Sequence, residues 1–320
     1  MASVSQHIEI RDIDQLGEAL QGWETEPVQL SSGSLDLVLS TAEVGTCALL
    51  QLSVAPRIAD RSAVHAGFIG FVLAERPQTW CGLEIEPPTL VIMRSGREMR
   101  SVLAPDYRSL EFYFKEKDIL NHPLGKTLCR KRFDPERSIV PLSNLMATRL
   151  RNVANAIFSD SDTLDGGSDP VLVHEAIQNR ILDLLDSVIR PRLDTSPSVN
   201  EQKRRKPKNS FLTIAALEKI ERSFPTRVSV ADLCNQLGVS RRALELAFEN
   251  TLGVSPGQYL LAYRLNSVRN NLVTKGGPVT ESATFAGFHD ASRFSFQYQR
   301  LFGELPSQTL SRRFGGRGKS

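Results

Sequence analysis

The sequence has few of the residues from which metal centres and disulfide frameworks are built. Its four cysteines (Cys47, Cys81, Cys129 and Cys234) are scattered over 320 residues, and none forms a Cys-x-x-Cys pair. Neither a zinc knuckle nor a disulfide-stabilised fold is therefore indicated. The five histidines include no His-x-His pair, so the clustered ligands of a metal-dependent β-barrel enzyme are also missing. We expect no metal and no other cofactor.

Long apolar segments are absent as well. No run of 18 or more apolar residues occurs, and the N-terminal MASVSQHIEIRDID lacks the basic and then apolar pattern of a secretory signal. We therefore expect a cytoplasmic protein that has no membrane partner. Its length suits two domains, each with enough apolar residues to bury a core.

Charge is distributed unevenly along the chain. From Lys203 to Ser320 there are 19 Lys and Arg against 8 Asp and Glu, a formal charge of +11. The preceding residues hold 20 basic and 28 acidic side chains, a charge of −8. This asymmetry predicts that only the C-terminal part meets a polyanion.

Residues 1–125 have the pattern of a β-domain. Short apolar runs alternate with Gly, Pro, Ser and Asp clusters, which is typical of a β-sandwich or barrel. The runs lie at Leu35–Leu39, Cys47–Val54, Phe68–Leu73, Thr89–Met93 and Ser109–Phe114.

Residues 126–193 predict a helical hairpin, because apolar residues recur at helical spacing from Leu142 to Ile157 and again from Val173 to Val188. These two stripes could cover the β-domain or form a dimer interface, and the pattern favours neither. Residues 194–210 are almost devoid of apolar side chains and predict a basic linker. Its Lys203–Lys208 run is either solvated charge or an arm that contacts DNA phosphates.

Residues 211–320 predict an all-α domain with two helix-turn-helix units, at residues 229–251 and 279–302. Each unit has two short helices separated by a glycine, Gly238 in the first and Gly287 in the second. Ser229, Thr280 and Asp290 are expected to cap helices. Between the units, Ser255-Pro256 opens a longer helix of about 17 residues and roughly 25 Å, which can hold two recognition helices about one DNA turn apart.

These units resemble the DNA-binding domain of the AraC/XylS family of bacterial transcription regulators. The resemblance rests on VSVADLCNQLGVSRRALELAFENTLGVSPGQYLLAYRL (residues 228–265) and AGFHDASRFSFQYQRLFGELP (residues 286–306). It implies an α+β protein in which a cupin-like β-barrel or sandwich binds a small effector and a helical hairpin forms a homodimer. It also implies an activator that binds double-stranded DNA in adjacent major grooves and contacts RNA polymerase.

Carried over position by position, the resemblance assigns DNA contacts to the start of each recognition helix. In the first helix the residues are Ser240, Arg241, Arg242, Glu245 and Leu246. In the second they are Ala291, Ser292, Arg293 and Phe296, and the outward-facing Arg300 is expected to contact phosphate.

Leu246 and Phe296 stand where relatives often have polar residues. Each is about 200° round its helix from an inward residue, Leu244 or Phe294, so neither is expected to join the core stripe. We hypothesise that both contact thymine methyl groups, while Arg242 and Arg293 contact guanine O6 and N7. The alternative is that Phe296 packs on a neighbouring helix or on a partner such as polymerase.

Two enzymatic alternatives remain weaker than a regulator. A metal-dependent cupin-type enzyme needs clustered ligands, whereas His65 and His122 are isolated. A DNA-repair methyl acceptor fused to the same DNA-binding fold needs a reactive cysteine in a zinc-bound cluster, and the scattered cysteines provide none. We therefore expect no enzymatic activity. The sequence assigns no residues to the effector pocket.

Overall fold

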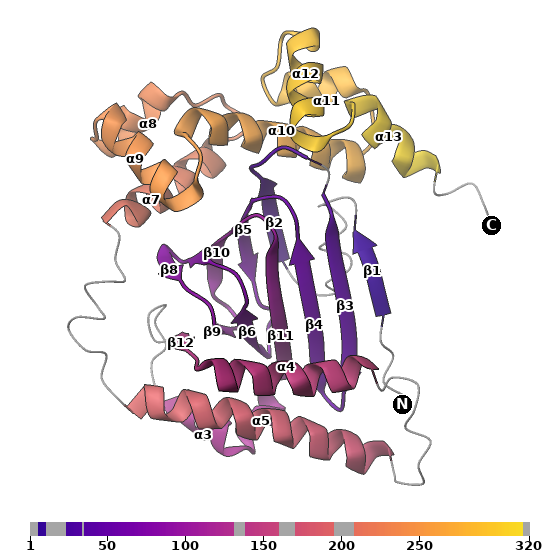
Figure 1. Cartoon of the computed structure of the whole chain (residues 1–320). Helices are drawn as coiled ribbons and strands as arrows, with labels where there is room; N and C mark the ends of the chain where they lie inside the picture. The colour runs from indigo at the N-terminus through magenta and orange to yellow at the C-terminus, as the bar shows by residue number, and fades with distance from the viewer. Residues whose placement is uncertain are drawn as a thin grey trace.

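The computed structural model describes residues 6–10, 24–33, 35–130, 138–159, 170–194 and 208–315. Two antiparallel sheets form the N-terminal part, and helices make up the rest (Figure 1). The seven-stranded sheet has the order β1 (Gln6–Ile10), β3 (Leu37–Val44), β4 (Cys47–Val54), β11 (Tyr107–Lys115), β6 (Phe68–Ala74), β9 (Thr89–Arg94) and β12 (Ile139–Pro141). The five-stranded sheet has the order β2 (Glu24–Gln29), β5 (Ile58–Ala63), β10 (Glu98–Leu103), β7 (Gln78–Trp80) and β8 (Leu83–Ile85).

The helices form two groups on either side of the β-domain (Figure 1). The first group follows the sheets and consists of α2 (Glu116–Leu120), α3 (Pro123–Arg130), α4 (Asn144–Ser159) and α5 (Pro170–Asp194). The C-terminal group consists of α7 (Lys208–Ser223), α8 (Val230–Leu237), α9 (Arg241–Leu252), α10 (Pro256–Thr274), α11 (Val279–Phe285), α12 (Ala291–Phe302) and α13 (Pro306–Gly315). Within the described ranges, none of these helices is long and apolar enough to cross a membrane.

Three apolar cores hold the sheets and the helices together. One core lies between the seven-stranded sheet and α3, α4 and α5, and it contains Phe112, Leu150 and Ile181. The apolar stripes of α4 and α5 are therefore used to cover the sheet, which was one of the two interpretations that their pattern allowed. A second core fills the space between the two sheets, and the third lies among the C-terminal helices.

The five-stranded sheet takes part in two of these cores because successive residues of a strand face opposite sides. On β5, Ile58 belongs to the core between the sheets, whereas Ala59 belongs to the core of the C-terminal helices. Val28 and Val102 of the neighbouring strands extend the same outer apolar surface. This sheet is therefore both a wall of the β-domain and the surface on which the C-terminal domain packs.

The structure confirms the expected α+β architecture and adds strands that the apolar runs did not predict. The five predicted runs correspond to β3, β4, β6, β9 and β11. Strands β2, β5, β7, β8 and β10, the whole second sheet, were not predicted. Strand β12 lies inside residues 126–193, where only helices were expected, and pairs with β9. Most of the predicted linker lies outside the described residues, and α7 begins at Lys208 within its last residues.

Candidate nucleic-acid interface

The first helix-turn-helix unit is fixed by reciprocal capping. Ser229 Oγ accepts a hydrogen bond from the Asp232 backbone N–H at 3.1 Å, and Asp232 Oδ2 accepts one from the Ser229 N–H at 2.8 Å. The Ser229 hydroxyl also donates to Asp232 Oδ2 at 2.7 Å, and this bond, together with the one from the Ser229 N–H, lowers the pKa of the Asp232 carboxyl below its usual value. Gly238 then ends α8 in the left-handed conformation, with φ +65°, which glycine adopts without strain. The predicted capping box and turn are both confirmed.

The second unit has a weaker first helix and a well-capped second helix. Helix α11 begins after Pro278 without a side-chain cap, so Thr280 lies inside the helix and its predicted capping role is wrong. Asp290 caps α12 as expected, because its Oδ1 accepts a hydrogen bond from the Arg293 N–H at 2.9 Å. Gly287, with φ +77°, makes the turn between the two helices.

Helix α10 holds the two units together. Its 19 residues, at about 1.5 Å each, make it about 28 Å long. The guanidinium of Arg264 donates to the carbonyl oxygens of Ala286 and Gly287, both at 2.7 Å, and lies 4.1 Å from the centre of the Phe288 ring. The turn of the second unit is therefore attached directly to the connecting helix.

Each recognition helix has a buried face and an exposed face. Leu244, Ala247 and Phe248 of α9 are buried, as are Phe294, Tyr298 and Leu301 of α12. Leu246 is 44% exposed and Phe296 is 65% exposed. Neither joins the core, so the expected orientation is confirmed, and Phe296 does not pack into a neighbouring helix. The remaining predicted contact residues that are exposed are Ser240, Arg241, Arg242, Ala291, Ser292, Arg293 and Arg300.

Two of the predicted contact residues of α9 already bond each other. Arg241 Nε lies 2.8 Å from Glu245 Oε1, an i,i+4 ion pair on the helix surface. Ser240 Oγ accepts a hydrogen bond from the Ala243 N–H at 3.2 Å and so acts as the helix cap. Arg242 is exposed and has no ion-pair partner within the described residues. The spacing of Arg241 and Glu245 could have revealed their pairing from the sequence.

The C-terminal ends of both recognition helices are bonded to the β-domain, which the sequence did not predict. Gln29 Nε2 donates to the carbonyl oxygen of Leu301 in α12 at 2.9 Å, and the Gly33 N–H donates to the same oxygen at 3.1 Å. Arg57 Nη1 donates to the carbonyl of Leu252, the last residue of α9, at 3.5 Å. A cation or donor suits this end of a helix because its last carbonyl groups lack partners within the helix.

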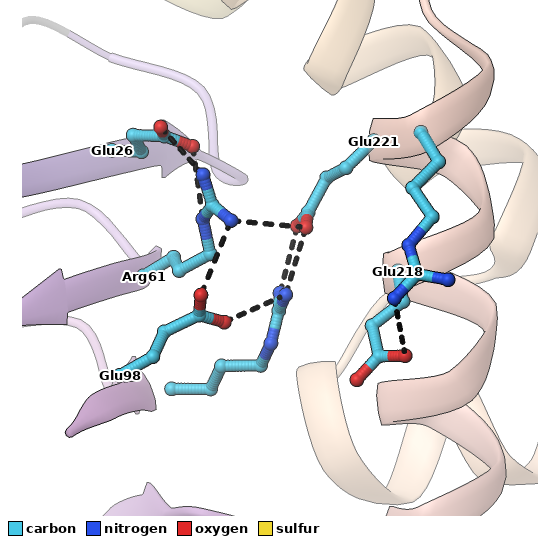
Figure 2. Close-up of polar contacts among 7 residues, drawn as sticks. Glu26, Arg61, Glu98, Glu218 and Glu221 are labelled. Atoms are coloured by element: carbon cyan, nitrogen blue, oxygen red, sulfur yellow. Dashed lines mark hydrogen bonds and ion pairs between the residues drawn. The ribbon is translucent and has the colours of Figure 1, made fainter.

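Charged side chains form a second contact between the domains, here called the interdomain ion cluster: Glu26, Arg61, Glu98, Arg100 and Glu221 (Figure 2). Arg100 makes a bidentate pair with Glu221 of α7, with both N–O distances at 2.7 Å. Arg61 lies 2.6 Å from Glu26 and 3.3 Å from Glu98. Glu221 is the C-terminal domain's member of this cluster, and it connects α7 to Arg61 of β5 and Arg100 of β10.

A family model described as a helix-turn-helix domain matches residues 233–312. The chain is 36% identical over 95 residues to the XylDLEGF operon transcriptional activator 2 of Pseudomonas putida, an alignment that covers 29% of this chain and 60% of that protein. It is 33% identical over 99 residues to the probable thc operon regulatory protein of Rhodococcus erythropolis, covering 30% of each. These alignments therefore span less than two thirds of either relative.

Among solved structures, the AraC-like transcriptional activator CuxR is similar over 88% of this chain and 98% of that chain, with 15% identity and a TM-score of 0.41. The family match falls on the part of the chain that contains α9, α10 and α12. Residues 233–312 are therefore a helix-turn-helix domain of the AraC type.

Proposed function

We propose that this protein is a sequence-specific DNA-binding transcription regulator that places α9 and α12 in adjacent major grooves. The observation that carries the proposal is the pair of exposed helix faces attached to one rigid connecting helix. A connecting helix about 28 Å long suits two recognition helices whose contacts with the major groove lie one DNA turn, ~34 Å, apart. The excess of basic residues in this part of the chain supports phosphate contact.

Arg242 and Arg293 are proposed to contact guanine, and Leu246 and Phe296 to contact thymine methyl groups. Their exposure on the outer faces of α9 and α12 supports this assignment. Arg241 and Glu245 are proposed to contact DNA only after their mutual ion pair opens. Ser240, Ala291 and Ser292 lie at the N-terminal ends of the two helices, where backbone N–H groups favour contact with phosphate.

The test is selection of bound sites from a randomised duplex library by the full-length protein, followed by footprinting. The expected result is a site with two protected major-groove segments about one helical turn apart. The Arg242→Ala variant should lose specificity, whereas Arg222→Ala, which removes an exposed arginine of α7, should bind like the parent. No enrichment of any sequence over the starting library would contradict the proposal.

We further propose that the regulator is an activator that contacts RNA polymerase and responds to a small-molecule effector in the β-domain. The hydrogen bonds between the β-domain and both recognition helices support this, because an effector that alters the conformation of the β-domain can alter the position of these helices. Transcription in vitro from a selected site is expected to rise when the protein is added. Unchanged transcript levels with and without the protein would contradict activation.

A homodimer is proposed to form through the outer faces of α4 and α5. Their inner stripes cover the sheet, and Leu145 and Leu172 are exposed on the two helices. Sedimentation of the full-length protein is expected to give the mass of two chains. The Leu172→Ser variant should shift the equilibrium toward the monomer, and a monomeric parent would contradict the proposal.

A further inference from the structure

A cavity of about 90 Å³ lies between the two sheets of the β-domain. Its apolar wall includes Leu52, Val72, Trp80 and Met93. Its polar wall is formed by Asp60 of β5 and, on β11, by Glu111 and two tyrosines. A space that combines an apolar wall with a few convergent polar groups has the character of a small-molecule site.

The two carboxylates in this cavity are bonded very differently. Glu111 accepts hydrogen bonds from Ser109 Oγ at 2.6 Å and from Tyr113 OH at 2.5 Å. Asp60 Oδ1 is buried and has no hydrogen-bond partner within the described residues, and the same is true of Thr25 Oγ1 beside it. A buried polar atom without a hydrogen-bond partner is costly, so a ligand that donates a hydrogen bond to Asp60 would remove this cost.

No positively charged side chain borders these carboxylates in the cavity, because the described residues that line it include no Lys, Arg or His. Burial raises the pKa of Asp60 to about 6, although the nearby Ser62 and Thr25 hydroxyls favour its charged form, and the negative charges of Glu26 and Glu111 act in the same direction as burial. Burial also raises the pKa of Glu111. A buried carboxylate is stabilised chiefly by pairing with a positive charge, so a cation is the kind of ligand that suits this cavity.

We propose that this cavity binds a small organic cation, with a protonated amino group between Asp60 and Glu111 and an apolar portion against Trp80. Aromatic faces favour an ammonium group nearby, and Tyr107 and Tyr113 line the same space. An anionic ligand would be repelled by both carboxylates. The described residues contain no group of three or more His, Cys, Asp or Glu that could hold a metal ion, which favours an organic cation over a divalent metal.

The inference rests on the proposed function, since it names the chemical class of the effector. Thr25, Asp60 and Ser101 border both this cavity and a cleft of about 230 Å³ between the five-stranded sheet and the C-terminal helices. Their chain neighbours Glu26, Arg61 and Arg100 belong to the interdomain ion cluster. A cation bound at Asp60 therefore lies one residue from Arg61, which pairs with Glu221 of α7.

Trp80 allows the proposal to be tested in the full-length protein. The chain has two tryptophans, so the Trp23→Phe variant retains Trp80 alone as a fluorescent reporter inside the cavity. Titration with n-butylamine is expected to change its emission saturably, whereas 1-butanol and butyrate, of similar shape but uncharged and anionic, should bind at least tenfold more weakly. Binding of n-butylamine is expected to weaken as the pH falls through about 6, because Asp60 is then protonated.

Three further substitutions in the Trp23→Phe variant test whether the two carboxylates of the cavity bind the amine. Asp60→Asn and Glu111→Gln should each weaken n-butylamine binding at least tenfold, whereas Glu84→Gln, at an exposed carboxylate of the same sheet, should leave it unchanged. Equal binding of 1-butanol, preferred binding of butyrate, or full n-butylamine binding by both cavity variants would overturn the proposal. DNA selection with the same protein is independent, so its failure would count against the regulator alone.

Discussion

Asp60 and Arg61 are consecutive residues of β5, and their side chains lie on opposite sides of the five-stranded sheet. Asp60 lines the cavity between the sheets, and Arg61 lies in the interdomain ion cluster, 3.9 Å from Glu221 of α7. A strand places neighbouring side chains on opposite faces, so a change at one face moves the backbone that carries the other. This arrangement places the internal cavity and the contact with α7 on consecutive residues of β5.

Removing the charge of Glu221 is expected to loosen the domain contact. Glu221→Gln leaves Arg100, which is 13% exposed, without its bidentate partner, a loss of about 1–3 kcal/mol. Hydrogen exchange in α7 and in the outer strands should become faster. Glu218→Gln on the same helix is the matched control (Figure 2), because Glu218 is more exposed and, within the described residues, forms an ion pair only with Arg222, at 3.9 Å. Equal exchange in the two variants would contradict this role of the ion cluster.

Asn266→Ala is expected to destabilise the contact between α10 and β2. The Asn266 amide accepts from the Gln29 N–H and donates to the Gln29 carbonyl oxygen, both at 3.1 Å in a buried setting. Both backbone groups would lose a partner, at a cost of about 1–3 kcal/mol. Urea unfolding of the full-length protein measures the change. Asn270→Ala, one turn further along α10 and exposed, should change stability by less than about 0.5 kcal/mol.

Arg242→Ala is expected to damage sequence specificity more than Arg293→Ala. Arg242 lies at the start of α9, whose predicted DNA-contact residues are mostly polar. The predicted contact residues of α12 include the apolar Ala291 and Phe296. Loss of a bidentate guanine contact costs about 1–3 kcal/mol of discrimination. Competition binding of the selected site against single-base variants measures it. A larger loss of discrimination in Arg293→Ala would reverse the ranking.

Phe296→Ala is expected to weaken DNA binding without changing stability. The side chain is 65% exposed, so its truncation should change the free energy of unfolding by less than about 0.5 kcal/mol. The matched test on the DNA is replacement of thymine by uracil across the selected site. Replacement of at least one thymine by uracil should lower the affinity of the parent. At one of these positions the same replacement should not lower the affinity of Phe296→Ala. Unchanged affinity at every substituted thymine would rule out the methyl contact.

Asp60→Asn is expected to stabilise the ligand-free protein near neutral pH. The folded-state pKa is raised to about 6, compared with about 3.9 in an unfolded chain, so the folded state binds the proton more tightly between these values. This contribution to stability is present below about pH 4 and is lost as the pH rises through about 6. Glu111, Tyr107 and Tyr113 of β11 face Asp60 across the cavity, and Glu26 on β2 adds negative charge.

The variant should therefore exceed the parent in free energy of unfolding at pH 7.5 by about 1–3 kcal/mol, since one pKa unit corresponds to about 1.4 kcal/mol. The difference should shrink toward pH 4.5. Denaturant unfolding at both pH values measures it, with Glu84→Gln as control. A variant less stable than the parent at pH 7.5 would show that Asp60 is stabilised in its charged form without a ligand.

The C-terminal domain was predictable from the sequence because its signals are local. The Ser229–Asp232 capping box, Gly238 and the inward stripe of α9 each involve residues a few positions apart, and each is observed. The exception is Thr280, where a suitable capping residue stands one position inside α11 and Pro278 precedes the helix. A residue type indicates the ability to cap, whereas the chain path decides which residue does so.

The second sheet was not predictable because its strands carry polar residues on both faces. On β5, Asp60 faces the cavity and Arg61 faces the ion cluster, so the strand shows no apolar alternation. Strand β10 combines Arg100 with the buried Ser101 in the same way. The pattern that marks a strand depends on an apolar core face, and the charged residues in these strands obscure it.

The sequence by itself determined the two helix-turn-helix units, the connecting helix and the exposed faces of α9 and α12, since helix caps, glycine turns and helical periodicity act over a few residues. Only the tertiary structure brought together Gln29 with Asn266 and Leu301, and Arg100 with Glu221. These partners lie more than a hundred positions apart, and no local pattern specifies a contact that forms only when the sheet and the helices pack against each other.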